Sequence, residues 1–190
     1  MYKFFISSLL SLTVVCSGCK SGELISETDE SNSVPWTECS YETGDHPCDF
    51  DLVDQNGDTM SLYENYGKVI VIDFSTEWCG YCQVAASDIQ RISSEYDKEN
   101  FVYITIIIET MSGSEPTQDD LKRWADNFGI IDAPVLSGNR SLIASEANDG
   151  WSVTGWPTFY FITSDMIIHE VLRGYSASSI DYLIEDTMSQ

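Results

Sequence analysis

Basic residues are scarce in this 190-residue chain. It contains 9 lysines and arginines against 31 aspartates and glutamates, which gives a formal net charge of −22 at pH 7. Proteins that bind nucleic acids present a basic surface to the phosphates, so the composition excludes that class of function. Hydrophobic residues make up 43% of the chain and aromatic residues 12%, which is enough to bury a core. We therefore expect one folded domain with an extension and a strongly solvated surface.

The chain also lacks a hydrophobic run long enough to remain in a membrane, which takes about 20 apolar residues. Its most apolar stretch, residues 4–15, follows Lys3 and precedes small residues, as in a secretory signal. The sequence Val15-Cys16-Ser17-Gly18-Cys19 resembles the lipobox of bacterial lipoproteins, with Cys16 where Leu or Val is usual. We predict a signal peptide over residues 1–18 and a lipid on Cys19, with plain secretion as the alternative.

Residues 20–38 are rich in Ser, Glu, Asp and Thr and have little to bury, as expected of a tether. The predicted organisation is a signal peptide (1–18), a lipid-anchored flexible tether with a Cys39–Cys48 loop (19–48), and a folded domain (49–190). The lipobox resemblance implies a bacterial cell envelope location facing the periplasm.

Cysteines are few but informative. Of the six, Cys16 would leave with the signal and Cys19 would carry the lipid, so an even number remains, which suggests two pairs in an exported protein. The remaining four are Cys39, Cys48, Cys79 and Cys82.

The first pair, Cys39 and Cys48, flanks a polar loop that contains Gly44 and Pro47. We expect a structural disulfide that closes this loop at the start of the domain. Two alternatives stay open: a metal site begun by these cysteines with His46, and a shuttle that passes electrons to the second pair.

Patterns of hydrophobic residues predict strands alternating with helices and then a hairpin and a helix, which indicates an α/β sheet covered on both faces. A first hairpin is expected over residues 50–62, with Asn56-Gly57 supplying two positive φ angles. The expected strands are 69–74, 101–108, 158–162 and 166–172, the last two joined by a Ser164-Asp165 turn. The expected helices are 80–96, one capped by Thr117 and ended by Gly129, and one beginning at Ser176, with a less regular stretch over 133–150.

Cys79 and Cys82 form a C-x-x-C between a buried strand and a helix. Structural zinc needs two more ligands, and the only histidines, His46 and His169, have no suitable cysteine beside them. Backbone N–H groups and the dipole at the start of a helix stabilise the thiolate of Cys79. Cys82 lies one helical turn further on and can close a disulfide, the arrangement that a reversible dithiol requires.

Two stretches resemble the signatures of the thioredoxin superfamily. Val71-Ile72-Asp73-Phe74-Ser75-Thr76-Glu77-Trp78-Cys79-Gly80-Tyr81-Cys82 is similar to its strand and active-site motif, and Gly155-Trp156-Pro157-Thr158-Phe159 is similar to its cis-proline loop. The resemblance covers about residues 49–188. It implies a thioredoxin-like fold with a central mixed sheet flanked by helices. The N-terminal hairpin and an inserted helix-strand segment before Pro157 are similar to envelope redoxins related to cytochrome-maturation proteins.

The resemblance implies a thiol–disulfide oxidoreductase with Cys79 as nucleophile and Cys82 as resolving thiol. Asp73 would be the buried carboxylate that exchanges a proton with Cys82, with a satisfied structural carboxyl as its alternative role. Pro157 would leave neighbouring backbone groups free to pair with an extended substrate.

The groove for that substrate would be formed by Trp78, Gly80, Tyr81, Trp156 and Thr158, although the two tryptophans could instead belong to the core. Gly80-Tyr81 and Trp156 depart from the residues of reducing thioredoxins. Both positions tune the redox potential, so the direction of electron transfer stays open. The implied partners are envelope protein thiols and disulfides and a membrane-bound or soluble thiol donor or acceptor, with no metal and no other cofactor.

Three other functions compete. A thiol peroxidase would explain the T-x-x-C spacing of Thr76 and Cys79, although the proline expected ahead of it is absent. A copper-binding lipoprotein would use a longer cysteine spacing with a distant histidine, and His169 lies in another element. An interaction module without redox activity would not need intact Cys79 and Cys82.

Overall fold

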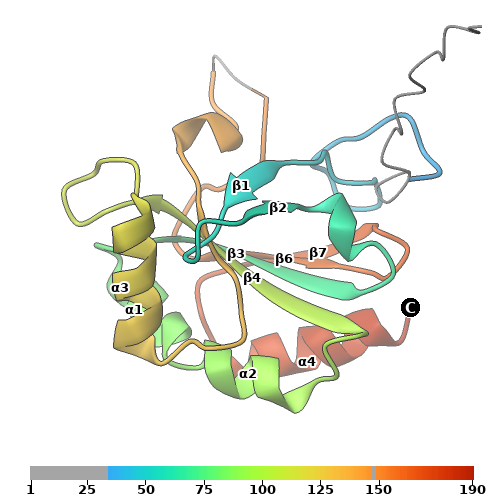
Figure 1. The fold of residues 1–190 in the computed structure, drawn as a ribbon. Coiled ribbons are helices and arrows are strands. Elements are labelled where there is room, and N and C mark those ends of the chain that lie inside the picture. The colour runs from blue at the N-terminus through green and yellow to red at the C-terminus, as the bar shows by residue number, and fades with distance from the viewer. Residues whose placement is uncertain (1–33, 147–148) are drawn as a thin grey trace, which may run out of the picture. The chain divides into compact units, whose positions relative to one another are not determined.

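The computed structural model describes residues 34–146 and 149–190, and its centre is a five-stranded sheet in the order β5-β4-β3-β6-β7 (Figure 1). The predicted signal peptide, Cys19 and tether residues 20–33 lie outside the described residues. The strands are β1 (Asp51–Val53), β2 (Thr59–Ser61), β3 (Val69–Thr76), β4 (Phe101–Glu109), β5 (Val135–Ser137), β6 (Thr158–Ile162) and β7 (Ile168–Arg173). The helices are α1 (Gly80–Ala86), α2 (Ile89–Glu95), α3 (Gln118–Phe128) and α4 (Ala177–Met188).

The sheet is mixed: β3 pairs in parallel with β4 and antiparallel with β6. Every residue of β3 is buried, because packed side chains cover the sheet on both faces. The predicted α/β class, mixed sheet and N-terminal hairpin are confirmed. The inserted segment contains α3 and the short strand β5, which adds to the edge of β4.

Side chains alternate between two cores along β3. Val69 and Val71 belong to the core that also contains Ile89 and Ile92 of α2 and the cysteines of α1. Figure 1 shows α2 and α4 on this side of the sheet. The even-numbered residues, such as Ile72, face the second core, on the side of the β1–β2 hairpin. None of the helices in the described part of the chain is long and apolar enough to span a membrane.

The helix predicted over residues 80–96 is divided into α1 and α2. After Ala86 the backbone N–H of Ser87 bonds to the carbonyls of Ala85 and Gln83, and the Ser87 hydroxyl donates to the Val84 carbonyl. Such side-chain bonds to the backbone compete with a continuing helix.

Two turns also differ from prediction. In the β1–β2 loop only Gly57 has a positive φ, of 93°. The carboxylate of Asp54 accepts the backbone N–H of Asn56 and of Asp58, at 2.7 and 3.0 Å, and organises a longer loop. In the second hairpin Met166 has a φ of 58°, so the turn is longer and β7 begins at Ile168 rather than at residue 166.

Cys39 and Cys48 form a disulfide. A cystine offers no thiolate to a metal, so the metal-site alternative for this pair with His46 is wrong. The loop between the cysteines is bonded to β7, because the Gly44 N–H donates to the Ile168 carbonyl and the Ile168 N–H donates to the Asp45 carbonyl.

This disulfide lies at the opposite end of the sheet from Cys79. Ile168 pairs with Ile162 of β6, and Ile162 pairs with Ile70 near the start of β3. Cys79 follows the other end of β3, about 20 Å away at 3.3 Å per residue. Direct exchange within one molecule between the two pairs therefore has no path, which disfavours the shuttle alternative.

We predict that replacing Cys39 and Cys48 together by serine lowers the free energy of unfolding by about 2.5–3 kcal/mol, the chain-entropy value for a loop of about ten residues. Chemical denaturation measures this loss. Reduction of a disulfide substrate by the folded variant should stay near the wild-type rate, and loss of turnover without unfolding would contradict a structural role.

Candidate active site

Cys79 and Cys82 are both free thiols at the start of α1. Cys79 is the N-cap residue, and its Sγ accepts the backbone N–H of Cys82 at 3.2 Å. Charge on a capping group is stabilised by such an N–H. Cys79 keeps 7% of its surface exposed and Cys82 none, so Cys79 is the more accessible of the two thiols.

Asp73 of β3 lies on the same side of the sheet as these cysteines and is 1% exposed. Its two carboxyl oxygens accept hydroxyl groups, from Ser75 at 2.7 Å and from Tyr103 of β4 at 3.3 Å. The sheet therefore holds a carboxyl group in an apolar layer with only two hydroxyl donors to replace water.

Burial raises the pKa of Asp73 from 3.8 to about 7, and the hydrogen bonds from Ser75 and Tyr103 lower it in part. Burial also raises the pKa of the Cys82 thiol well above its usual value, and the charge of Asp73 and the contact with Cys79 raise it further. A group with a pKa near 7 can take up or release a proton at neutral pH. Cys82, in contrast, needs a base before it can react.

Two tryptophans flank Cys79 and are held by a charged pair. The Trp78 Nε1–H donates to Glu109 at 2.9 Å, and the Arg140 Nε–H donates to the other oxygen of Glu109 at 2.6 Å. The Arg140 guanidinium lies 5.7 Å from the centre of the Trp156 ring, whose edge-to-face partner is Trp78. We call these four residues the aromatic rim. The rim places two aromatic rings beside Cys79, and the Arg140–Glu109 ion pair holds these rings in position.

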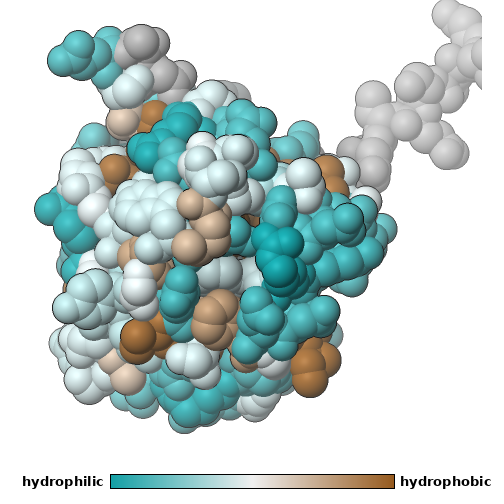
Figure 2. Space-filling model, turned by 90° about the vertical axis from the view of Figure 1, so that its left-hand side faces the viewer, coloured by the Kyte–Doolittle hydropathy of each residue, from teal (hydrophilic) through white to brown (hydrophobic). Residues whose placement is uncertain are grey.

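The surface around the pair is partly apolar. Tyr81 is 70% exposed, Met111 66% and Val84 53%. Figure 2 views the molecule from the side of α1 and α3 and shows apolar patches between hydrophilic ones.

The Trp156-Pro157 peptide bond is cis. Trp156 packs against the core cluster that contains both cysteines. The Thr158 hydroxyl donates to the Gly155 carbonyl at 2.7 Å and is buried, so Thr158 supports the loop from within. Gly155 is in turn close to the side chain of Arg173, which a Cβ at this position would meet at 2.9 Å.

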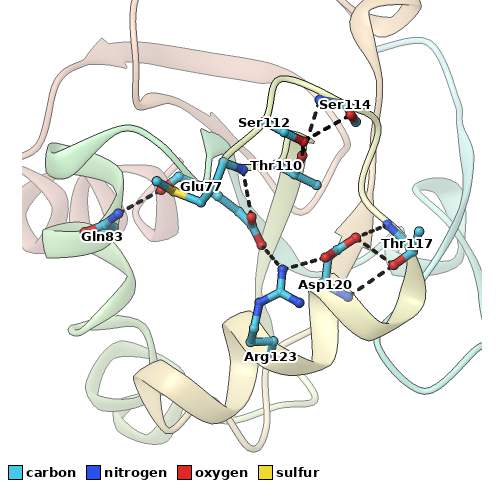
Figure 3. Close-up of polar contacts among 9 residues, drawn as sticks. Glu77, Gln83, Thr110, Ser112, Ser114, Thr117, Asp120 and Arg123 are labelled. Carbon is cyan, nitrogen blue, oxygen red and sulfur yellow. Dashed lines mark hydrogen bonds and ion pairs between the residues drawn. The ribbon is translucent and has the colours of Figure 1, made fainter.

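Glu77 ties the segment before Cys79 to the inserted residues (Figure 3). Its buried carboxylate accepts the Met111 backbone N–H at 2.9 Å and Arg123 of α3 at 3.0 Å. Arg123 also pairs with Asp120, whose pKa is lowered to about 2, chiefly by its hydrogen bonds from Thr117 and Arg123. The network fixes the loop after β4 and the start of α3 against the redox pair.

Within the described residues, no group of three or more His, Cys, Asp or Glu side chains could hold a metal ion. His169 bonds to Asp186 at 2.8 Å, and His46 bonds to the Met166 carbonyl and stacks on Trp36. Neither histidine contacts Cys79 or Cys82 in this part of the chain.

The AhpC/TSA family model matches residues 43–171, about two thirds of the chain. The chain belongs to the AhpC/TSA family. The thioredoxin-like protein YneN of Bacillus subtilis is 20% identical over 137 residues, which cover 72% of this chain and 75% of that protein. The thiol-disulfide oxidoreductase ResA of Oceanobacillus iheyensis is 26% identical over 140 residues, 70% of this chain and 66% of the relative.

Among solved structures, an exposed lipoprotein thioredoxin from Streptococcus pneumoniae superimposes with a TM-score of 0.57 at 24% identity, covering 73% of this chain and 99% of that one. This similarity concerns the fold, which is thioredoxin-like as predicted.

The sequence patterns and the thioredoxin resemblance together bring Cys79, Cys82 and Asp73 into one region, and the structure places them there. They miss Glu109 and Arg140, since Arg140 lies in a stretch without periodicity. They also miss Ser75, although its position two residues after Asp73 in a strand gives it the same face.

We predict that Asp73→Asn stabilises the fold in a pH-dependent way. Between about pH 4 and 7 the folded state holds a proton on Asp73 that the unfolded chain has released, so Asp73 makes the wild type lose stability as the pH rises through this window. The variant lacks this loss and should be more stable above pH 7 by on the order of 2–4 kcal/mol, and nearly equal at pH 4. Denaturation at several pH values measures the difference. The exposed residue Asp126 gives the control Asp126→Asn, for which a similar pH-dependent gain would contradict the assignment to burial.

Proposed function

We propose that this protein is a thiol–disulfide oxidoreductase that acts on protein disulfides and dithiols through Cys79-Gly80-Tyr81-Cys82. The observation that carries the proposal is the unequal pair: Cys79 caps α1 at the surface, while Cys82 is fully buried in the layer that holds Asp73. Membership of the AhpC/TSA family and the names of YneN and ResA support the same reaction class.

The reaction has two exchange steps. The Cys79 thiolate attacks one sulfur of a substrate disulfide, a mixed disulfide forms, and the other substrate sulfur leaves as a thiolate. Cys82 then gives up its proton to Asp73 and attacks Cys79 Sγ. The Cys79–Cys82 disulfide forms, the second substrate thiolate leaves, and two electrons have passed to the substrate. The reverse sequence oxidises a substrate dithiol.

The groove for the substrate would run between Trp78 and the Trp156-Pro157 loop. Within the described residues the backbone N–H and C=O of Trp156 make no hydrogen bond, and these groups are available to an extended chain beside Cys79. Gly80 and Tyr81, directly after Cys79, are exposed. The partners would be protein thiols and disulfides and a thiol donor or acceptor.

We further propose that Cys19 carries a lipid and that the protein works in the bacterial cell envelope, facing the periplasm. The lipobox resemblance of residues 15–19 supports this, as does the Cys39–Cys48 disulfide, since such bonds persist in oxidising compartments.

The thiol peroxidase alternative has no comparable support. The Thr76 hydroxyl is buried and has no hydrogen-bond partner in the described part of the chain, so it makes no hydrogen bond to the Cys79 thiol. An assay with hydrogen peroxide in place of a disulfide separates the two functions.

We predict that alkylation of the reduced protein near pH 6 labels Cys79 well before Cys82. Cys79 is the more exposed of the two, and as the N-cap of α1 its sulfur accepts a backbone N–H. Peptide mass spectrometry identifies the labelled residue. In Cys82→Ser the mixed disulfide with a substrate should accumulate on Cys79, and Cys79→Ser is the matched control that should trap nothing. Faster labelling of Cys82, or equal trapping by both variants, would contradict the assignment.

For the aromatic rim we predict that Arg140→Gln raises KM for a protein disulfide about two- to fivefold, because Trp156 and Glu109 lose the ion pair and the cation–π contact of roughly 0.5–1 kcal/mol that hold them in place. The rate of attack on a small disulfide should not change. Lys122→Gln removes an equal charge from an exposed position of α3 and serves as the control; an equal rise in KM there would indicate a general charge effect.

A further inference from the structure

Arg173 lies beside the loop that borders Cys79. It is the last residue of β7, and the N–H of the next residue, Gly174, donates to the Pro157 carbonyl at 2.8 Å. Trp156, the residue before this proline, packs against the core cluster that contains Cys79. The end of β7 is therefore attached to the border of the redox pair.

Gly155 leaves room for the side chain of Arg173. A Cβ at residue 155 would lie 2.9 Å from Cδ of Arg173 and 3.4 Å from its Cγ, so a larger residue would displace the arginine side chain. The Gly155 carbonyl accepts the Thr158 hydroxyl at 2.7 Å, which fixes the glycine from within the loop. The aliphatic part of Arg173 thus lies against Gly155, next to Trp156, whose backbone N–H and C=O make no hydrogen bond in the described residues. Arg173 remains exposed.

The guanidinium of Arg173 has no carboxylate partner within residues 34–146 and 149–190, although the whole chain has 31 acidic residues for 9 basic ones. Four other basic residues pair with carboxylates, and these are Arg91, Lys98, Arg123 and Arg140. The remaining cations without such a partner in these ranges lie elsewhere, before β3 and on α3, and are Lys68 and Lys122. Arg173 is therefore free to pair with a carboxylate from another molecule.

We propose that Arg173 selects substrates that carry an aspartate or glutamate close to the cysteine attacked by Cys79. This proposal rests on the proposed function and deepens it by naming the substrate class. A substrate strand that pairs with the backbone of Trp156 would carry its neighbouring side chains past Gly155, within reach of the arginine that lies against this glycine. A guanidinium binds a carboxylate through two parallel hydrogen bonds, which orient the substrate as well as attract it.

The acidity of the protein does not prevent this selection. At about 0.1 M salt, charges more than about 10 Å apart are largely screened, so the charges closest to the loop decide what a bound substrate meets. Arg140, the other guanidinium beside Trp156, is neutralised by Glu109 at 2.6 Å. A carboxylate on the substrate therefore has Arg173 as its ion-pair partner.

The test uses short peptides of alanine, serine and glycine with one cysteine, which is activated as a mixed disulfide with the uncharged leaving group thiopyridone. The Cys79 thiolate attacks the peptide sulfur, the bond to the thiopyridyl sulfur breaks, and the released thiopyridone takes up a proton and is measured by its absorbance. One set of peptides carries an aspartate next to the cysteine or one residue further away, on either side, and the matched set carries asparagine. All proteins compared carry Cys82→Ser, so that the reaction stops at the mixed disulfide and the release rate reports on Cys79 alone.

We expect an aspartate peptide to react about two- to fivefold faster than its asparagine counterpart at one or more of these positions, as for an exposed ion pair, and about 1 M salt to abolish the preference. Arg173→Gln should remove the preference, and Arg173→Lys should retain part of it. The control Lys122→Gln removes an equal charge from α3 and should keep the preference. Gly155→Ala should weaken it, because the added Cβ displaces the side chain of Arg173.

Equal rates for the two peptide sets, or a preference for aspartate that persists in Arg173→Gln, would overturn the selection. Loss of the preference in Lys122→Gln would also overturn it, since the attraction would then come from the overall charge. An unchanged preference in Gly155→Ala would overturn the role of Gly155 in placing the arginine. Release no faster than by free cysteine, with every peptide, would instead overturn the proposed function, and the selection with it.

Discussion

The desolvation of the Asp73 carboxyl at the end of β3 is the interaction on which the rest of the site depends. In water this group would be ionised at neutral pH, and burial raises its pKa to about 7. The same apolar layer suppresses ionisation of Cys82. Without Asp73 in the same layer, the buried thiol of Cys82 would be unreactive. In the proposed reaction, Cys82 can react because a group that can accept its proton, Asp73, is buried in the same layer.

The segment inserted between β4 and β6 supplies side chains to two flanks of the redox pair. Arg123 of α3 reaches Glu77, just before the pair, and Arg140 reaches both Glu109 and the face of Trp156. Seven basic residues lie in the described ranges, and two of them converge here. A strongly acidic protein thus places two of its few cations in ion pairs with the carboxylates beside its candidate active site, which reduces the local excess of negative charge.

The fold was largely predictable, because its central strands are unbroken apolar runs and α3 has both its cap, Thr117, and its terminating Gly129. The errors in the predicted elements occur where contacts with distant parts of the chain determine the local structure. Asp88, at the break between α1 and α2, bonds to Tyr175 and Arg91, and periodicity within residues 80–96 contains no information about the distant tyrosine. At the site, the motif identified the two cysteines and the carboxylate. The aromatic rim could not be predicted, because the contact between Glu109 and Arg140 depends on the path of an irregular segment.

The two cysteine pairs show how environment, rather than spacing, determines the role of a sulfur. Cys39 and Cys48 close a loop near the surface whose backbone is bonded to β7, and aromatic contacts of Trp36 and Tyr41 also hold this part of the chain. Cys79 and Cys82 lie where the strand, the helix and the core already fix the backbone. A covalent link there adds little order, so the bond can open and close while the fold persists. In the proposed reaction the two sulfurs differ because Cys79 keeps some exposure and Cys82 is buried in the layer that holds Asp73: Cys79 would meet the partner, and Cys82 would complete the exchange.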